Sequence, residues 1–246
     1  MFPPRLPLTT RIGLSAGIAA ACLLVVAEAA IPADSARSIS PSRSLAFLSQ
    51  PWDQASVGSI GGDVLQLALK AATCAIRSGD VAEAKTLTVI DYSRPSSEER
   101  LWVFDLQTRA LLYQELVAHG QGSGDNLATT FSNESGTHAS SIGLFATADT
   151  YVGHNGYSLR LQGLDRGFND RARERAIVLH GAPYVSQTFV KAQGRLGRSW
   201  GCPALREGVV REVIDRVKGS GLLFAYYPDA EWLRVSRYLG NCEATH

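Results

Sequence analysis

The sequence predicts a mainly β protein with flanking helices. Three observations favour this class. Short runs rich in β-branched and aromatic residues, some with period-two alternation, fill the centre of the chain. Glycine- and serine-rich segments without a helical period separate these runs, as loops between strands would. Apolar residues at helical spacing occur before the central region and after it.

The elements can be placed in chain order. A helix is expected at residues 63–77, which begins at Asp63 and ends before Gly79. Strands are expected at residues 87–91, 101–106, 110–118, 143–147, 157–161, 175–179 and 222–227. Two more helices are expected at 206–218 and 229–239. The charged run 165–175 interleaves acids and bases, which indicates a solvated turn or a short helix.

The N-terminus has the layout of a secretory signal. Two arginines precede the apolar stretch 12–26, and residues 27–29 (Ala-Glu-Ala) provide the small side chains of a cleavage site. Because the stretch is shorter than the ~20 residues of a spanning helix, cleavage is favoured over an uncleaved membrane anchor. We therefore expect a signal peptide at 1–29, a Ser/Pro/Ala-rich linker or arm at 30–60, and a folded domain at 61–246.

Composition narrows the classes of partner. The chain is 45% hydrophobic with a formal charge of +1, so it can build a core and gives no electrostatic reason to expect nucleic acid.

A zinc peptidase is an alternative, because His119, His138, His154 and His180 all lie in the central region. No pair of these residues has HExxH spacing, and no cysteine pair has zinc-ligand spacing. We therefore expect no metal and no cofactor.

Four cysteines occur, and Cys22 lies inside the expected signal. The remaining three are Cys74, Cys202 and Cys242. An odd number in an exported chain indicates either a reactive free thiol or pairing between chains. If Cys202 is the free thiol, Cys74 and Cys242 are left as a candidate disulfide in an oxidising compartment.

The segment 177–206 carries the strongest chemical signal. An apolar run brings His180 and Gly181 to the end of a strand, and Cys202 follows between a glycine and a proline. A thiol needs a nearby base, because the thiolate is the attacking species. We predict Cys202 as the nucleophile and His180 as its base. The alternatives are a small buried core cysteine and a histidine hydrogen-bonded at a strand end.

These residues also carry a resemblance to a family. His180-Gly181 and the run GRLGRSWGCPA resemble the YkuD-type L,D-transpeptidases, in the branch described as the murein L,D-transpeptidase catalytic domain family. VAHGQGSG, FSN, SSIGLF, YSLRLQGL, VLHGAPYV and LFAYYPD resemble that branch in the same order, so the likeness covers residues 87–239. It implies a β-sandwich-like catalytic fold, a cysteine that attacks peptidoglycan stem peptides, and a Gly181 carbonyl that orients the imidazole. Trp200 departs from the common pattern, which has histidine there.

Further site residues are expected around this motif. Gly201 leaves room beside the sulfur, so the backbone N–H groups of Gly201 and Cys202 are expected to form an oxyanion hole. Pro203 fixes φ and suits the start of a helix. Residues that could bind substrate are Ser199, Trp200, Arg195, Arg198, Tyr184, Ser141 and His154. The arginines match carboxylates but could equally be surface residues, and packing is the alternative for the others.

The resulting hypothesis is an exported cysteine acyltransferase, placed in the periplasm or cell envelope and monomeric. Its partners would be peptidoglycan stem peptides, with carbapenems as inhibitors that acylate Cys202. Water in place of an amine acceptor would make it an L,D-carboxypeptidase with the same thioester. A non-catalytic cell-wall-binding module would keep the fold and lose the chemistry.

Overall fold

A computed structural model describes residues 52–53, 57–240 and 242. Every described residue belongs to the unit Ile39–His246. The expected signal peptide and most of the expected arm lie outside the described residues. Within the part that the structure describes, no helix is both long and apolar enough to cross a membrane.

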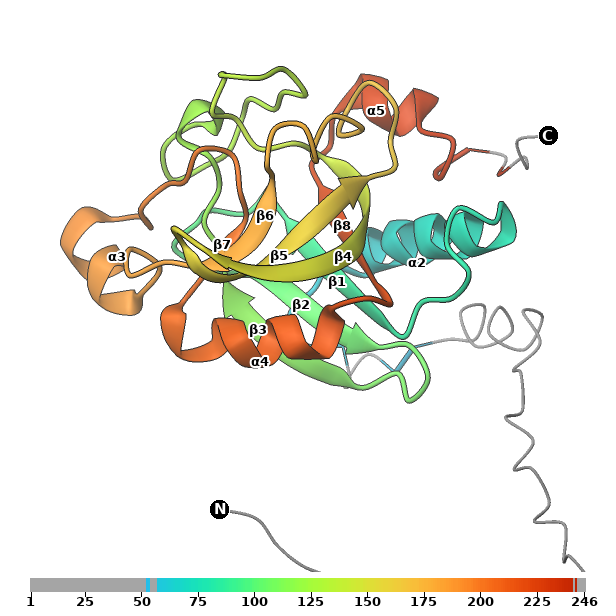
Figure 1. Cartoon of the computed structure of the whole chain (residues 1–246), viewed down its shortest axis with the longest axis horizontal. Helices are drawn as coiled ribbons and strands as arrows, with labels where there is room; N and C mark the ends of the chain where they lie inside the picture. Colours follow the sequence, from blue (N-terminus) through green and yellow to red (C-terminus); the bar gives the residue numbers. More distant parts are fainter. Residues whose placement is uncertain (1–51, 54–56, 241, 243–246) are drawn as a thin grey trace, which may run out of the picture. The chain divides into compact units, whose positions relative to one another are not determined.

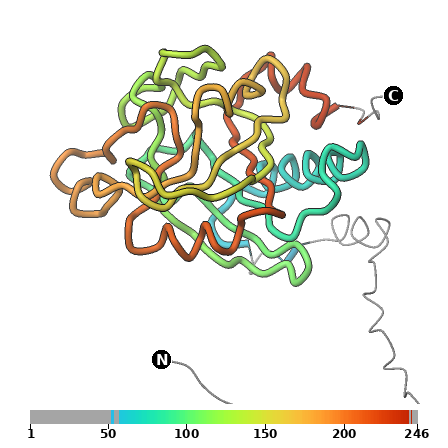
Figure 2. Tube along the Cα trace, viewed as in Figure 1, coloured from blue at the N-terminus to red at the C-terminus, as the bar shows by residue number. Residues whose placement is uncertain are grey.

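Eight strands form the centre of this unit. Figure 1 draws the strands as arrows, and Figure 2 traces the chain in the same view. The strand order in the sheet is β3-β2-β1-β8-β4-β5-β6-β7. The strands are β1 Thr86–Asp91, β2 Glu99–Asp105, β3 Leu111–Leu116, β4 Gly143–Gly153, β5 Gly156–Gly163, β6 Val178–Gly181, β7 Ala204–Leu205 and β8 Gly221–Tyr226. The pairs β1–β8 and β6–β7 are parallel and the others are antiparallel. The predicted class, mainly β with flanking helices, is confirmed.

Alternation along the strands gives the sheet two apolar faces, each covered by helices. One face packs against α2 (Gly62–Arg77) and the Trp232 side chain of α5 (Ala230–Val235). The other face packs against α4 (Glu207–Val217), which contributes five buried aliphatic side chains. On this second face, residues of β1 and β2 share one cluster with residues of β4, β5 and β6, so the sheet encloses a core. Figure 1 shows α2 and α4 beside the curved sheet.

A disulfide joins α2 to the end of the described chain. Cys74 and Cys242 are bonded, with 5.3 Å between their Cα atoms and a sequence separation of 168. Cys202 is the free cysteine among the described residues. The candidate pairing of Cys74 with Cys242 is therefore confirmed.

Two predictions differ from the structure, one about where the domain begins and one about the charged run 165–175. Val57 and Ile60, at the end of the expected arm, are buried in the core. The Trp52 ring packs edge-on against the Phe104 ring, with 5.4 Å between the ring centroids. The packing of the domain therefore starts before residue 61, because these apolar side chains cover the α2 face. The charged run is also not simply solvated, since Asp165 is buried and accepts hydrogen bonds from the Leu144 backbone N–H at 2.7 Å and the Ser236 hydroxyl at 2.5 Å.

The chain after the candidate nucleophile also differs. Pro203 is followed by the two-residue strand β7 and not by a helix, since α4 begins at Glu207. The short helix α3 (Gln187–Gln193) was not expected. It begins after Ser186, whose hydroxyl accepts the Phe189 N–H at 3.1 Å, and ends at Gly194 with φ of 72°.

Candidate active site

Cys202 lies in the turn that leads into β7, with its sulfur against the start of β6. The Val178 N–H donates toward Sγ at 3.5 Å, and Sγ lies 3.6 Å from the Ala176 carbonyl oxygen. Burial raises the pKa of the thiol, while the Val178 N–H and the Arg175 charge oppose that rise. The resting group is therefore a neutral thiol, held in place by backbone atoms of the neighbouring strand.

His180 lies on that neighbouring strand. In the parallel pair β6–β7 it is opposite Ala204, so Cys202, two residues earlier, is level with Val178. The Nδ1 atom is 2.9 Å from the Gly181 carbonyl oxygen. Because a carbonyl only accepts, Nδ1 carries the hydrogen and Nε2 of the neutral ring is an acceptor. Burial lowers the pKa of His180, so the ring is neutral and can take up a proton.

The turn around Cys202 is fixed by two serines. The Ser199 hydroxyl donates to the Cys202 carbonyl at 2.6 Å and accepts the Gly201 N–H at 3.1 Å. The buried Ser140 hydroxyl donates to the Gly201 carbonyl at 2.9 Å and accepts the Gly120 N–H at 3.0 Å. Both the N–H and the carbonyl of Gly201 are therefore hydrogen-bonded.

Gly201 is required by this geometry. Its φ is 112°, and a Cβ atom would lie 2.8 Å from the Ala139 carbonyl oxygen. Its N–H is bonded to Ser199, which changes the expected oxyanion hole. The Cys202 N–H has no hydrogen-bond partner among residues 57–240, so it alone of the two expected donors is unpaired. Ser199 likewise serves the turn and has no free hydroxyl for a substrate.

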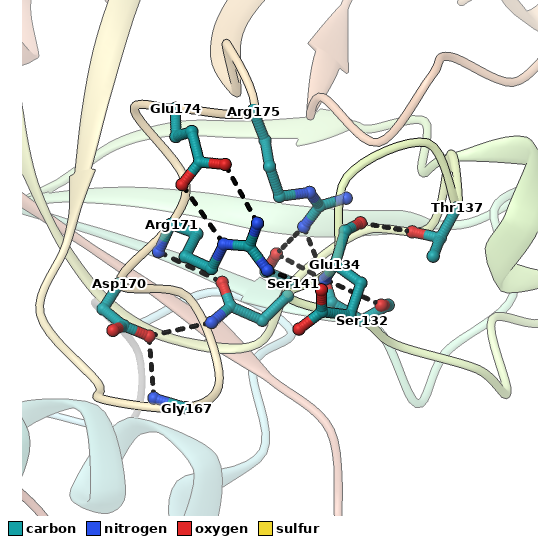
Figure 3. A network of polar contacts seen from close by, with 10 residues as sticks. Ser132, Glu134, Thr137, Ser141, Gly167, Asp170, Arg171, Glu174 and Arg175 are labelled. Atoms are coloured by element: carbon teal, nitrogen blue, oxygen red, sulfur yellow. Dashed lines mark hydrogen bonds and ion pairs between the residues drawn. The ribbon is translucent and has the colours of Figure 1, made fainter.

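Figure 3 shows a polar network that joins the charged run 165–175 to the segment 132–141. The Arg175 guanidinium donates to the Ser132 carbonyl at 2.5 Å, the Ser141 hydroxyl at 2.6 Å and the Ala139 carbonyl at 2.7 Å. Ser141 in turn donates to the Ser132 carbonyl at 2.9 Å, so its hydroxyl is occupied. Arg175 therefore ties the charged run to the segment that contacts Gly201, and Ser141 belongs to this support and not to a substrate surface.

Arg195 and Arg198, expected as carboxylate ligands, pair with the chain itself. Arg198 Nη1 lies 2.9 Å from both the Gly124 carbonyl oxygen and Asp125 Oδ1. Arg195 Nη1 donates to the Leu196 carbonyl at 2.8 Å, and its Nε is 3.8 Å from Asp125 Oδ1. Both arginines thereby hold the loop that follows His119.

Three other expected residues have different surroundings. Tyr184 packs against Gly197, and burial, followed by the Cys202 charge, raises the pKa of its phenol to about 12. The Trp200 side chain is 72% exposed and stacks on His138 with 5.0 Å between ring centroids. His154 lies at the exposed tip of the β4–β5 hairpin, about 20 Å along β5 from Arg160, which pairs with Val178. Tyr184 is thus brought near the sulfur, and His154 is not.

The sequence reasoning missed a buried cluster behind the site. Arg100 is fully buried and donates to His119 Nδ1 at 2.7 Å and to the Val117 carbonyl. Burial and the Arg100 charge lower the pKa of His119 to about 4. The His119 carbonyl accepts the Ser199 N–H at 3.0 Å, so this cluster supports the turn that contains Cys202. The sequence did contain a signal for this cluster, because Arg100 lies within the otherwise apolar strand β2.

No group of three or more histidine, cysteine or acidic side chains in the described part of the chain is arranged to hold a metal ion. The chemistry available at the site comes from a thiol, a neutral imidazole whose Nε2 can accept a proton, and an unpaired backbone N–H.

Comparison with solved structures finds L,D-transpeptidases and the protein Bd1075. An enzyme from Mycobacterium smegmatis shares 14% identity with a TM-score of 0.36, covering 58% of this chain and 59% of its own. L,D-transpeptidase 1 of Mycobacterium tuberculosis gives 12% and 0.33, with 58% and 62% covered. Bd1075 of Bdellovibrio bacteriovorus gives 16% and 0.38, with 59% and 49% covered. This chain thus covers less than two thirds of each relative's length. No curated protein sequence matches it.

The family assignment comes from the sequence. Residues 58–226 match the family model described as the L,D-transpeptidase catalytic domain. The matched region begins where the packed core begins and ends with β8, and it contains both His180 and Cys202. The chain belongs to the L,D-transpeptidase catalytic domain family.

Proposed function

We propose that this protein is an exported L,D-transpeptidase that uses Cys202 to cut and rejoin peptidoglycan stem peptides. One observation carries the proposal. The His180 Nδ1 hydrogen is bonded to the Gly181 carbonyl, which leaves Nε2 as an acceptor on the strand beside Cys202. Membership of the family supports a peptidoglycan-modifying enzyme. The Cys74–Cys242 disulfide supports export, because such bonds persist in oxidising compartments.

The first step is acylation. The Cys202 thiol gives its proton to His180 Nε2 as the sulfur attacks the carbonyl between an L-centre and a D-residue. The carbonyl oxygen becomes an oxyanion beside the Cys202 N–H. When the C–N bond breaks, the imidazolium returns its proton to the departing amine, and a thioester remains on the sulfur.

The second step transfers the acyl group. An amine of a second stem peptide attacks the thioester and gives a proton to His180. The sulfur leaves and regains the proton as a thiol, so the enzyme returns to its neutral starting state. Water in place of the amine gives hydrolysis and a tripeptide product.

Acylation can be tested with a carbapenem. A relative, the L,D-transpeptidase LdtMt1, has been solved in complex with imipenem. Attack by Cys202 on the lactam carbonyl opens the ring, moves the proton to the lactam nitrogen and adds the whole mass of the drug. We expect intact-protein mass spectrometry to show one adduct on the parent, none on Cys202→Ala and slower formation on His180→Ala. Equal labelling of Cys202→Ala and the parent would refute the assignment.

Transfer needs a separate assay. We expect incubation with disaccharide-tetrapeptide to give a cross-linked dimer with release of the terminal D-residue. Tripeptide without dimer would instead establish the carboxypeptidase reaction by the same thioester. A non-catalytic wall-binding module would give neither product nor adduct.

A further inference from the structure

Trp200 lies two residues before Cys202, and the proposed mechanism does not use it. The residue is 72% exposed, although its neighbours Ser199 and Gly201 are buried. Its indole stacks on the His138 ring, with 5.0 Å between the centroids and 8° between the planes. Because His138 covers one face of the indole, the exposed area lies on the opposite face and along the edges. The two rings form an aromatic stack with one face toward solvent.

The imidazole behind the indole is held by the loop around it. Gln121 Nε2 lies 2.9 Å from His138 Nδ1, and the His138 carbonyl accepts the Gly122 N–H at 3.0 Å. The preceding turn is closed by the Thr137 hydroxyl, which donates to the Glu134 carbonyl at 2.9 Å (Figure 3). His138 has φ of 53°, in the left-handed region that residues with a side chain seldom adopt. Such a conformation persists only where the surroundings impose it.

The loop that carries His138 packs directly on the turn that contains Cys202. A Cβ atom on Gly120 would clash with the His138 carbonyl oxygen and would lie 2.7 Å from the Gly201 Cα atom. A Cβ atom on Gly201 would lie 2.8 Å from the carbonyl oxygen of Ala139. These backbone segments are packed without room for a side chain, so they fix the position of the aromatic stack relative to the turn.

The charged side chains nearest to the aromatic stack in sequence are already paired. Arg198 forms an ion pair with Asp125, and Glu134 forms one with Arg171. The exposed Gln121 amide contacts the imidazole and is a neutral hydrogen-bonding group. A ligand that fits this surface therefore has an apolar face with neutral polar groups around it.

A sugar ring has this mixed character. Its C–H bonds lie on the two faces of the ring, and its hydroxyl groups lie around the edge. The oxygen atoms withdraw electrons from the C–H bonds, so the hydrogens are attracted to the negative face of an indole. We propose that the aromatic stack binds a sugar ring of the glycan chain that carries the stem peptide, an inference that rests on the proposed function.

The length of the stem peptide agrees with such a site. The attacked carbonyl belongs to the third residue of the stem, so three extended residues, at most about 11 Å, separate it from the glycan. The Cα atoms of Trp200 and Cys202 are at most about 7 Å apart. A stem whose third carbonyl lies at the sulfur is thus long enough to place its sugar on the indole. Free stem peptides lack this contact, so the aromatic stack favours stems that are still attached to the glycan.

The first test compares two substrates with three proteins. The substrates are disaccharide-tetrapeptide and the same tetrapeptide without sugar, and the readout is the ratio of their kcat/KM values for loss of the terminal residue. We expect the parent to favour the sugar-linked substrate by at least about 5-fold, from burial of one indole face and the ring contact. Trp200→Ala should bring the ratio close to unity through a higher KM, because the sugar is remote from the reacting carbonyl. Val152→Ala, which removes an apolar side chain that is 79% exposed near the end of β4, is the matched control.

The second test measures binding without turnover. Saturation-transfer NMR is recorded with the peptide-free disaccharide of peptidoglycan as the probe. We expect magnetisation transfer from the parent and from Val152→Ala, and its loss in Trp200→Ala. Because no bond is cut, this readout does not depend on Cys202.

The sugar site is overturned by a parent ratio close to unity, by a ratio that Trp200→Ala leaves unchanged, or by equal magnetisation transfer from the parent and Trp200→Ala. It is also overturned if Trp200→Ala keeps the sugar preference and instead forms less dimer relative to tripeptide, which would assign the indole to the cationic acceptor amine. A parent that forms the imipenem adduct without a sugar preference refutes the sugar site alone. A parent that binds the disaccharide through Trp200 but forms neither adduct nor product supports the sugar site and refutes the proposed function.

Discussion

Removal of the Cys74–Cys242 disulfide should lower the stability of the domain by a predictable amount. The bond links residues 168 apart in sequence and ties the end of the chain to α2. In the chain-entropy model, a closed loop of that length lowers the entropy of the unfolded chain and so stabilises the fold by about 5 kcal/mol at 25 °C. Removal of a native disulfide typically lowers the free energy of unfolding by about 2 to 5 kcal/mol. We expect Cys74→Ala/Cys242→Ala to lose free energy of unfolding within that range.

The assay is urea unfolding followed by tryptophan fluorescence, with Cys202→Ser as the parent so that no free thiol interferes. Urea slopes of about 1–3 kcal/mol per molar convert the loss into a midpoint lower by about 1 M or more. Reduction of the Cys202→Ser protein is the matched control, because it opens the bond without changing a side chain. The reasoning fails if the oxidised and reduced proteins unfold at the same urea concentration, or if the double variant loses less than about 1 kcal/mol.

Two further predictions concern the nucleophile turn. Burial lowers the pKa of His180 below its ordinary 6.5 and raises that of Cys202 above 9.0, so the neutral base persists as pH falls through 6.5. Imipenem acylation should therefore hold its plateau at pH 6.5 and decline only at lower pH; a midpoint at or above 6.5 contradicts this. Gly201→Ala puts a Cβ 2.8 Å from the Ala139 carbonyl at φ of 112°. This strain, of order 1–3 kcal/mol, should slow acylation at least about 5-fold with circular dichroism unchanged; an unaffected rate would show that the turn tolerates the side chain.

Local patterns were enough to predict most elements. The helical spacing of residues 63–77 matches α2, and the apolar runs at 87–91, 101–106 and 222–227 match β1, β2 and β8 to within two residues. Each of these elements buries one face, so its apolar residues recur at the regular spacing of a helix or a strand. The strand expected at 175–179 begins only at Val178, because Ala176 adopts φ of 54° and ends a turn. Nothing in the order of residues indicates that conformation.

The supports of the site depend on contacts between distant segments. Ser140 reaches Gly201 across 61 residues, and Arg175 reaches Ala139 across 36. Serine in a glycine-rich loop and arginine in a charged run each suit solvent as well as a buried network, so their types do not reveal the role. That His180 and Cys202 come from neighbouring segments was predictable, because the two residue types are rare together and the surrounding motif is specific. β7, with two residues, is too short to leave a period.

The position of the Cys202 sulfur has a consequence for oxidative folding. In an unfolded chain Cys202 is 40 residues from Cys242, whereas Cys74 is 168 residues away. Closing the shorter loop costs about 1.3 kcal/mol less, so random pairing favours the wrong partner roughly ninefold. In the native structure the turn holds the Cys202 sulfur against β6, whereas Cys242 is bonded to Cys74 of α2. The native contacts thus keep the thiol apart from the cysteine that is nearer to it in sequence.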